Sequence, residues 1–286
     1  MVQTVERIPT SNEKIVSNSS RLVPGGPAMN AAATIVALGG QARLVSAIGD
    51  SDVGKLIKQV LYMKGIELTD CAPPEFTPPI SSVLINAATG DRSVVSANGT
   101  QIKTLKLPNL SSFRECSSIL VDGHYMELCK MFAVASKKSG TPVIMDAGSW
   151  KDGTDQLLDS VDFPVFSADF RVPSVDSFQT YMSNKGIPAF AVSFGDKKIK
   201  LYTGLSVQTI EVPVVDVVDT LGAGDVLHGA VTYLIGRIGF SLGKIPKILE
   251  LAAFIASESC RFSGALSWAE CPSSLSIISK RIADEL

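Results

Sequence analysis

Residues 219–225 read DTLGAGD, and this stretch decides how the whole chain is interpreted. The apolar residues 212–218 before it are strand-like, and helix-period residues 222–237 follow, which predicts a strand-to-helix turn. Small residues at the mouth of a helix let the backbone approach an anion, which the free N–H groups then face. Asp225 falls in the first turn of that helix, where a carboxylate can take a proton from an attacking hydroxyl. The alternative is an ordinary acidic helix start, but two aspartates around the glycines favour a functional turn.

A second feature is the stretch GGPAMNAA at residues 25–32. Proline near its start and the apolar spacing after it predict a helix over residues 27–38. Asn30 lies about one turn inside this helix, where asparagine is a poor helix former. Its amide therefore either binds a ligand or is a satisfied core group, and sugar hydroxyls are ligands that asparagine binds well.

Apolar runs alternate with helix-period segments through most of the chain. Strands are expected at residues 42–48, 119–121, 142–145 and 189–194, and further helices at residues 54–64, 127–138 and 245–262. Continuous apolar strands between helices are typical of a parallel sheet that is covered on both faces. The sequence therefore predicts an α/β fold.

One stretch interrupts this alternation. Residues 79–97 read as strand, turn and strand, which predicts a hairpin inserted between α/β units. Residues 12–22 could add a further strand beside it. Such an antiparallel flap is either a lid over a ligand cleft or an edge decoration without a moving part, and the pattern leaves both open.

The composition excludes several classes of protein. The 286 residues include 26 basic and 28 acidic side chains and carry a net charge of −2, whereas a nucleic-acid binder has a basic face. Two histidines rule out a His-rich metal site, and the five scattered cysteines form no ligand pair and fit a reducing compartment. Neither a secretory signal nor a membrane-spanning apolar run is visible. We therefore expect a cytoplasmic protein with neither nucleic-acid nor membrane partners.

Residues 49–55, GDSDVGK, match the spacing of a phosphate-binding P-loop. Leu56 stands where serine or threonine would hold Mg²⁺, and Asp50 and Asp52 place two negative charges in a loop that would have to cradle phosphate. We interpret this match as accidental.

Taken together, these residues resemble the ribokinase-like (PfkB-type) carbohydrate kinases. The two signature regions of that family correspond to residues 25–52, with GGxxxN, LGG and GDxDVG, and to residues 219–225. The resemblance implies a single kinase domain over residues 1–286, with a three-layer α/β/α body, a mainly parallel sheet and a small β lid. Lid strands are expected within residues 10–25 and 79–98. The implied activity is ATP-dependent phosphorylation of a hydroxymethyl group on a small sugar-like substrate.

The resemblance also assigns roles to individual residues. It makes Asp225 the catalytic base and the turn before it the anion hole for the transferred phosphoryl group. The hole consists of Gly222, Ala223 and Gly224. The implied substrate-binding residues are Gly26, Asn30, Asp219 and His124, of which His124 is equally well read as a helix-cap or loop residue. The implied nucleotide-binding residues are Ser193, Gly195, Thr220, Gly224, Ser263 and Gly264.

Three departures from the family pattern bear on these expectations. Pro27 replaces the lysine that ribokinases carry after the paired glycines, which argues against ribose as the substrate. Residues 167–170, SADF, stand where many members carry NxxE, so Ser167 and Asp169 are partial substitutes near Mg²⁺. Met1 begins where the family's first buried strand, with its substrate-binding aspartate, has already finished. The expected protein is therefore either a truncated kinase or a natural variant with weakened activity.

The resemblance implies ATP and Mg²⁺ as cofactors, and by analogy it allows a K⁺ ion and a homodimer formed through the lid. The competing hypothesis is a catalytically weakened relative that binds a sugar or nucleotide without efficient turnover. A nucleoside kinase is the nearest alternative among enzymes.

Overall fold

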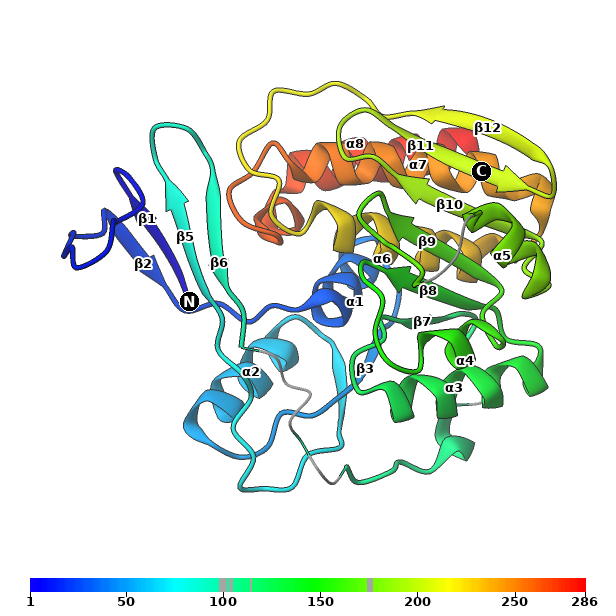
Figure 1. Ribbon diagram of the computed structural model, residues 1–286, viewed down its shortest axis with the longest axis horizontal. Helices are drawn as coiled ribbons and strands as arrows, with labels where there is room; N and C mark the ends of the chain where they lie inside the picture. Colours follow the sequence, from blue (N-terminus) through cyan, green and yellow to red (C-terminus); the bar gives the residue numbers. More distant parts are fainter. Residues whose placement is uncertain (98–101, 103–104, 114, 174–176) are drawn as a thin grey trace. The chain divides into compact units, whose positions relative to one another are not determined.

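The computed structural model describes residues 1–97, 102, 105–113, 115–173 and 177–286 (Figure 1). Contacts divide the chain into two compact units. The smaller unit contains Met1–Gly25, Val45–Met63 and Leu68–Lys106, and the larger contains Gly26–Leu44, Lys64–Glu67 and Leu107–Leu286.

A six-stranded sheet forms the centre of the larger unit, in the order β12-β11-β10-β9-β8-β7. Its strands are β7 (Ile119–Val121), β8 (Val143–Ala147), β9 (Phe163–Ser167), β10 (Ala189–Ser193), β11 (Lys198–Thr203) and β12 (Ser206–Glu211). The four strands from β7 to β10 pair in parallel, and β10, β11 and β12 pair antiparallel. Within the described residues, β7 pairs with β8 alone.

Helices cover both faces of this sheet, which gives the larger unit three layers (Figure 1). One face packs against α3 (Met126–Ser139), α4 (Thr154–Leu158) and α5 (Phe178–Asn184). The other packs against α6 (Ala223–Ile238), α7 (Ile245–Ser259) and α8 (Pro272–Glu285), and α1 (Pro27–Ala37) packs on α6. Short 3₁₀ turns are η2 (Leu110–Phe113), η3 (Leu242–Lys244) and η4 (Ser267–Glu270).

Strand β8 explains why its sequence is apolar without alternation. Val143 and Met145 point into the core beneath α3 to α5, whereas Ile144 points into the core beneath α6 to α8. Each of the three side chains is at most 1% exposed, because successive residues of a strand face opposite sides. The expected α/β arrangement is therefore present.

The expectation of a strand at residues 212–218 is wrong. Strand β12 ends at Glu211, and Pro213 has no N–H group to donate to a neighbouring strand. Val214 is 98% exposed, so the apolar run does not enter the core. The backbone N–H groups of Val218 and Asp219 donate instead to the carbonyl oxygen of Cys260, just after α7.

The smaller unit contains a four-stranded sheet in the order β2-β1-β5-β6. Its strands are β1 (Val2–Val5), β2 (Ser19–Arg21), β5 (Ser82–Asn86) and β6 (Arg92–Val95). Strands β5 and β6 form the expected antiparallel hairpin, and β2 lies within residues 12–22. Strand β1, which pairs in parallel with β5, was not anticipated in this sheet. Residue 98, the last of the expected lid range, lies outside the described residues.

One helix and a two-stranded sheet remain besides these. Helix α2 (Asp52–Met63) belongs to the smaller unit. Strands β3 (Arg43–Ser46) and β4 (Glu67–Asp70) form a two-stranded sheet, and the division between the units falls within both. In the part of the chain that the structure describes, no helix has the length and apolar character needed to span a membrane.

Candidate active site

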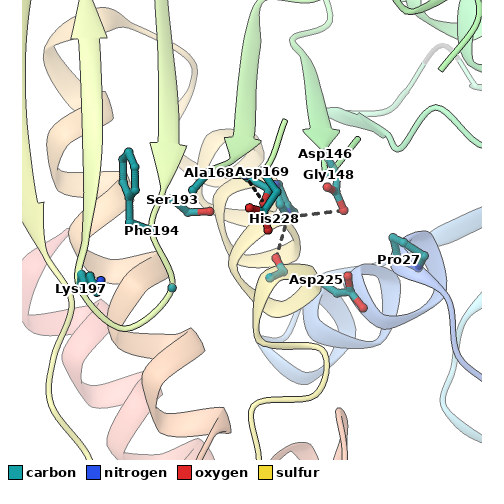
Figure 2. A pocket seen from close by; sticks show the side chains of 13 residues that line it. Pro27, Asp146, Gly148, Ala168, Asp169, Ser193, Phe194, Lys197, Asp225 and His228 are labelled. Atoms are coloured by element: carbon teal, nitrogen blue, oxygen red, sulfur yellow. Dashed lines mark hydrogen bonds and ion pairs between the residues drawn. The ribbon is translucent and has the colours of Figure 1, made fainter. Parts of the chain in front are cut away.

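A pocket in the larger unit lies where parallel strands end and α6 begins (Figure 2). Ligands of α/β sheets bind at the carboxyl ends of the strands, and β8, β9 and β10 all contribute here. The lining residues are Pro27, Asp146, Gly148, Ser167, Ala168, Asp169, Ser193, Phe194, Gly195, Lys197, Gly224, Asp225 and His228.

The turn before α6 is held in place by Asp219. One oxygen of its carboxylate accepts a hydrogen bond from the Leu221 N–H at 2.9 Å, and the other accepts one from the Gly264 N–H at 2.8 Å. Gly222 has a φ of +79°, and a Cβ built on it would lie 2.5 Å from the Cβ of Ala265. Only glycine fits there, because the backbone is left-handed and the loop after α7 is in contact.

Two backbone N–H groups at the start of α6 are available to a ligand. The Ala223 N–H donates to the Thr220 carbonyl at 3.3 Å, but those of Gly224 and Asp225 have no acceptor among the described residues. A Cβ built on Gly224 would meet no heavy atom within 4 Å. The first turn of α6 therefore presents donors to an open space, as an anion-binding helix start does.

Asp225 is the half-buried acid beside these donors. Its Oδ2 accepts a hydrogen bond of 2.6 Å from the Nδ2 of Asn30, a residue 195 positions away in the chain. Burial raises the pKa of Asp225 to about 6, and the charge of Asp146 adds to this rise, while Asn30 and His228 oppose it. A carboxyl group with such a pKa is suited to accept a proton near neutral pH.

A close contact between α1 and α6 brings Asn30 to Asp225. A Cβ on Gly229 would lie 2.7 Å from the Ala31 carbonyl oxygen and 2.9 Å from the Thr34 Cβ. The absence of a side chain at Gly229 therefore lets the two helix backbones approach each other. Asn30 is 7% exposed, and its buried Oδ1 has no hydrogen-bond partner among the described residues. A hydroxyl donor would satisfy this oxygen.

Asp146 and His228 form a buried pair in the lining of the pocket (Figure 2). The Nδ1 of His228 lies 3.5 Å from the Asp146 Oδ2. Burial raises the pKa of Asp146, and the positive charge of His228 opposes that rise. Neither residue was predicted to belong to the site.

Each had a signal in the sequence. Asp146 directly follows the apolar run 142–145, at the end of a strand where functional carboxylates gather. His228 interrupts an apolar helix three residues after Asp225. Lys197, which also lines the pocket, lies in the turn between β10 and β11 and had no comparable signal.

Of the residues expected in the site, Ser193, Gly195, Gly224 and Asp225 line the pocket, and Asn30 contacts Asp225. The others lie outside its lining. Gly222, Ala223, Thr220 and Asp219 shape the turn, Ser263 and Gly264 lie in the loop after α7, and Gly26 precedes α1. Their roles in binding stay predictions.

His124 lies in the loop between β7 and α3, outside the lining of the pocket. Its Nδ1 is 3.1 Å from the Asp122 Oδ2, and its backbone N–H donates to the Asp122 Oδ1 at 2.9 Å. Burial pushes the pKa of Asp122 up, but the bonds from His124 hold it below its ordinary value. Of the two interpretations left open, this geometry agrees with the loop residue, while contact with a substrate stays a prediction.

The P-loop-like stretch holds no vacant phosphate cradle. The Asp70 carboxylate accepts hydrogen bonds from the N–H groups of Ile48 and Gly49, at 2.9 and 3.0 Å. Lys58 forms ion pairs with both Asp50 and Asp70. The chain's own carboxylate occupies the donors that a phosphate would need, which agrees with the interpretation of this match as accidental.

Among the described residues, no three His, Cys, Asp or Glu side chains gather as a metal cluster. Asp169 places one exposed carboxylate on the pocket at the end of β9. Magnesium in phosphoryl-transfer sites is held by one or two carboxylates together with phosphate oxygens and waters. A single carboxylate beside the pocket therefore fits a Mg²⁺ ion that arrives with a nucleotide.

Comparison with known proteins places the chain in a family. A sequence model of the pfkB family carbohydrate kinases matches residues 1–269. The chain is 26% identical to an aminoimidazole riboside kinase of Salmonella typhimurium over 243 residues, covering 77% of this chain and 76% of that protein. It is 25% identical to a ribokinase of Arabidopsis thaliana over 283 residues, covering 92% and 73% respectively.

Solved structures show the same fold. A protein of Agrobacterium tumefaciens assigned as a ribokinase has a TM-score of 0.83 at 21% identity, covering 100% of this chain and 95% of that one. The Arabidopsis thaliana ribokinase, solved with ribose and ATP, has a TM-score of 0.74 at 23% identity, covering 98% and 95%. At these identities the likeness concerns the fold alone.

The fold and the site thus define a carbohydrate kinase, and the chain belongs to the pfkB family. Its fold is the ribokinase-like α/β fold with a mainly parallel sheet and a small β-sheet lid, as the resemblance implied. Members of this family phosphorylate a sugar with ATP.

Proposed function

We propose that this kinase transfers the γ-phosphoryl group of ATP to a hydroxymethyl group of a small sugar, with Asp225 as the general base. The observation that carries the proposal is the start of α6. There a half-buried carboxylate with a raised pKa lies next to two backbone N–H groups that lack acceptors among the described residues. A base and an anion site within one helical turn are what the attack of an alcohol on a phosphate requires.

Asp225 and the two backbone N–H groups have separate roles in the reaction. Asp225 takes the proton of the sugar hydroxyl as the oxygen–phosphorus bond forms, and the bond between the γ-phosphorus and the bridging oxygen of ADP breaks. The N–H groups of Gly224 and Asp225 donate to the oxygens of the transferred phosphoryl group, where negative charge is stabilised. The open space above Gly224 accommodates that group.

The sugar side of the site involves Asn30. Its Nδ2 orients the Asp225 carboxylate, and its buried Oδ1 accepts a hydrogen bond from a second sugar hydroxyl. An asparagine that contacts both the base and the substrate fixes the attacking oxygen relative to the base. Pro27, which lines the pocket, offers no charge there.

The nucleotide side is the turn between β10 and β11. Ser193, Gly195 and Lys197 line the pocket there, and the ammonium group of Lys197 can contact phosphate oxygens. Asp169 would hold Mg²⁺ from the protein side. When bound, that ion neutralises charge on the β- and γ-phosphates.

The two curated relatives act on ribose and on a riboside by their names. We therefore place the substrate among pentoses, other small sugars and nucleosides, and propose a panel of these for the assay. Competition between adenosine and simple sugars for the site separates a nucleoside kinase from a sugar kinase.

The test is Asp225→Ala, measured as ATP-dependent formation of sugar phosphate. Loss of the general base is expected to lower kcat by roughly 10²–10⁴-fold while nucleotide binding persists. Asp216→Ala is the matched control, because Asp216 is an exposed aspartate nine residues earlier. Near-full activity of Asp225→Ala would remove Asp225 from this role. If the unaltered chain binds ATP but forms no product from any sugar or nucleoside, the weakened binding protein is the better description.

A further inference from the structure

His228 is a buried titratable group that the mechanism above does not use. It lies on α6 three residues after Asp225, and its side chain is 7% exposed. Its Nδ1 lies 2.6 Å from the carbonyl oxygen of Gly224, and its Nε2 lies 3.1 Å from that of Val165 on β9. The ring therefore joins the start of α6 to the middle of the central strand β9.

Both ring nitrogens face oxygens that can only accept a hydrogen bond. A carbonyl oxygen has no hydrogen, so each nitrogen must supply one. A neutral imidazole has one N–H, and its second nitrogen would then point a lone pair at a carbonyl oxygen. In a buried place this nitrogen and the carbonyl oxygen would face each other with no hydrogen between them, which is costly. The geometry thus favours a ring with two protons and a positive charge.

The surroundings of the ring balance this charge. The nearest carboxylate is Asp146 on β8, at 3.5 Å, and it is 8% exposed. Asp225 lies on α6 itself, and Asp122 follows β7; both contribute negative charge to this region. The opposing positive groups are Lys151 and His124. With three carboxylates close by, a charged imidazole is compensated, although the start of a helix by itself disfavours a cation.

The bond to Gly224 connects the ring to the anion site. The Gly224 carbonyl belongs to the same peptide group as the Asp225 N–H, one of the two donors proposed for the phosphoryl oxygens. A charged donor on the carbonyl polarises that peptide group, which strengthens its N–H as a donor. It also holds the peptide plane in one orientation.

We propose that His228 is a positioning residue of this kinase, whose doubly protonated ring fixes the peptide group between Gly224 and Asp225 and favours the ionised form of Asp225. The proposal rests on the proposed function for its effect on catalysis. The charge state of the ring, however, is a property of the protein without substrate and is tested separately.

The first experiment is ¹⁵N NMR of the histidine rings in the full chain. Only His124 and His228 occur in the sequence, so a His124→Gln variant identifies the signals of His228. We expect both nitrogens of His228 to carry hydrogen, because each faces a carbonyl oxygen. A ring that carries a single hydrogen at pH 7 overturns the proposal, whether or not the chain is active.

The second experiment compares His228→Asn with unaltered enzyme in ATP-dependent sugar phosphorylation. Loss of the charge is expected to lower kcat roughly tenfold to a hundredfold, with little change in the KM of the sugar. It should also move the acidic limb of the kcat/KM profile to higher pH, because the positive ring no longer favours the Asp225 carboxylate. If the acidic limb of the kcat/KM profile stays at the same pH in His228→Asn, the proposal is wrong.

Thr232→Val is the matched control. Thr232 is buried on the same helix and donates from its Oγ1 to the His228 carbonyl at 2.7 Å, without contact to the ring. This variant is expected to lose stability but to keep the position of the acidic limb. If His228→Asn does not fold, the NMR result decides alone. If the unaltered chain transfers no phosphate, the proposed function is wrong. The NMR spectrum still decides whether the His228 ring carries two hydrogens.

Discussion

Asp225 places a carboxyl group where folding favours its protonated form. Its pKa rises to about 6 from an ordinary value of 3.8, mainly because it is buried. A raised pKa means that the folded state holds the proton more tightly than the unfolded chain does. The stability that this proton contributes is therefore present at low pH and is lost as the pH rises through about 6.

The Asp225→Asn variant tests the direction of this pH dependence of stability. The amide has no charge to bury, so at pH 8 the variant should be more stable than the unaltered chain, by up to about 3 kcal/mol. At pH 3 the difference should nearly vanish, because Asp225 is then protonated in both the folded protein and the unfolded chain. Thermal unfolding at the two pH values measures this, with Asp216→Asn as the control. A variant that is less stable at pH 8 contradicts the assignment.

Two glycines of one turn should respond differently to the same substitution. Gly222→Ala places a Cβ 2.5 Å from Ala265 and forces an L residue into left-handed backbone, so it should destabilise the fold by about 1–3 kcal/mol. Gly224→Ala has open space and a helical backbone, so stability should hold while kcat falls because the methyl group enters the phosphoryl space. Denaturant unfolding and turnover, measured together, separate the two effects.

At the scale of elements, the packing of α1 on α6 assembles the base with its orienting amide. Gly229→Ala would place a Cβ within 3 Å of Ala31 and Thr34, which must push the helices apart. We expect a loss of stability of about 1–3 kcal/mol and a lower kcat, since the bond between Asn30 and Asp225 lengthens. Gly243→Ala, in η3 with no neighbour within 4 Å, is the control and should change neither quantity.

Elements were predictable where a local pattern is strong. The helix expected at residues 127–138 is α3 (Met126–Ser139), and the strand expected at residues 119–121 is β7. The pattern failed at residues 212–218, where valines are abundant but Pro213 and the lack of a neighbouring strand leave them exposed. Strand propensity has an effect only where a partner strand and a covered face exist.

At the scale of the whole molecule, binding of Mg²⁺ and ATP should stabilise the fold. A ligand at 100 times its dissociation constant adds about 2.7 kcal/mol to the free energy of unfolding. We expect the Tm to rise with ATP and to rise further when Mg²⁺ is present. Asp169→Asn should remove most of the Mg²⁺-dependent part, whereas Asp284→Asn on α8 should not. If ATP raises the Tm by the same amount with and without Mg²⁺ in every variant, Asp169 does not have this role.

The sequence by itself determined the α/β class, the turn at residues 219–225 and the identity of Asp225 as the candidate base. These rest on apolar periodicity and on glycines within a few residues of a helix start, which are local properties. It also indicated that the P-loop-like match was accidental, although the reason visible in the structure, Asp70 on the loop's N–H groups, was not accessible from the pattern.

Only the tertiary structure decided which distant groups meet. Asn30 reaches Asp225 across 195 positions because α1 and α6 bury apolar faces against each other at Gly229. Asp146 and His228 meet because a strand end and a helix start converge at one edge of the sheet. The Asp219 carboxylate proved to join the turn before α6 to the loop after α7, because it accepts hydrogen bonds from both. Such contacts depend on how buried surfaces pack, which involves the whole chain and leaves no local pattern in the sequence.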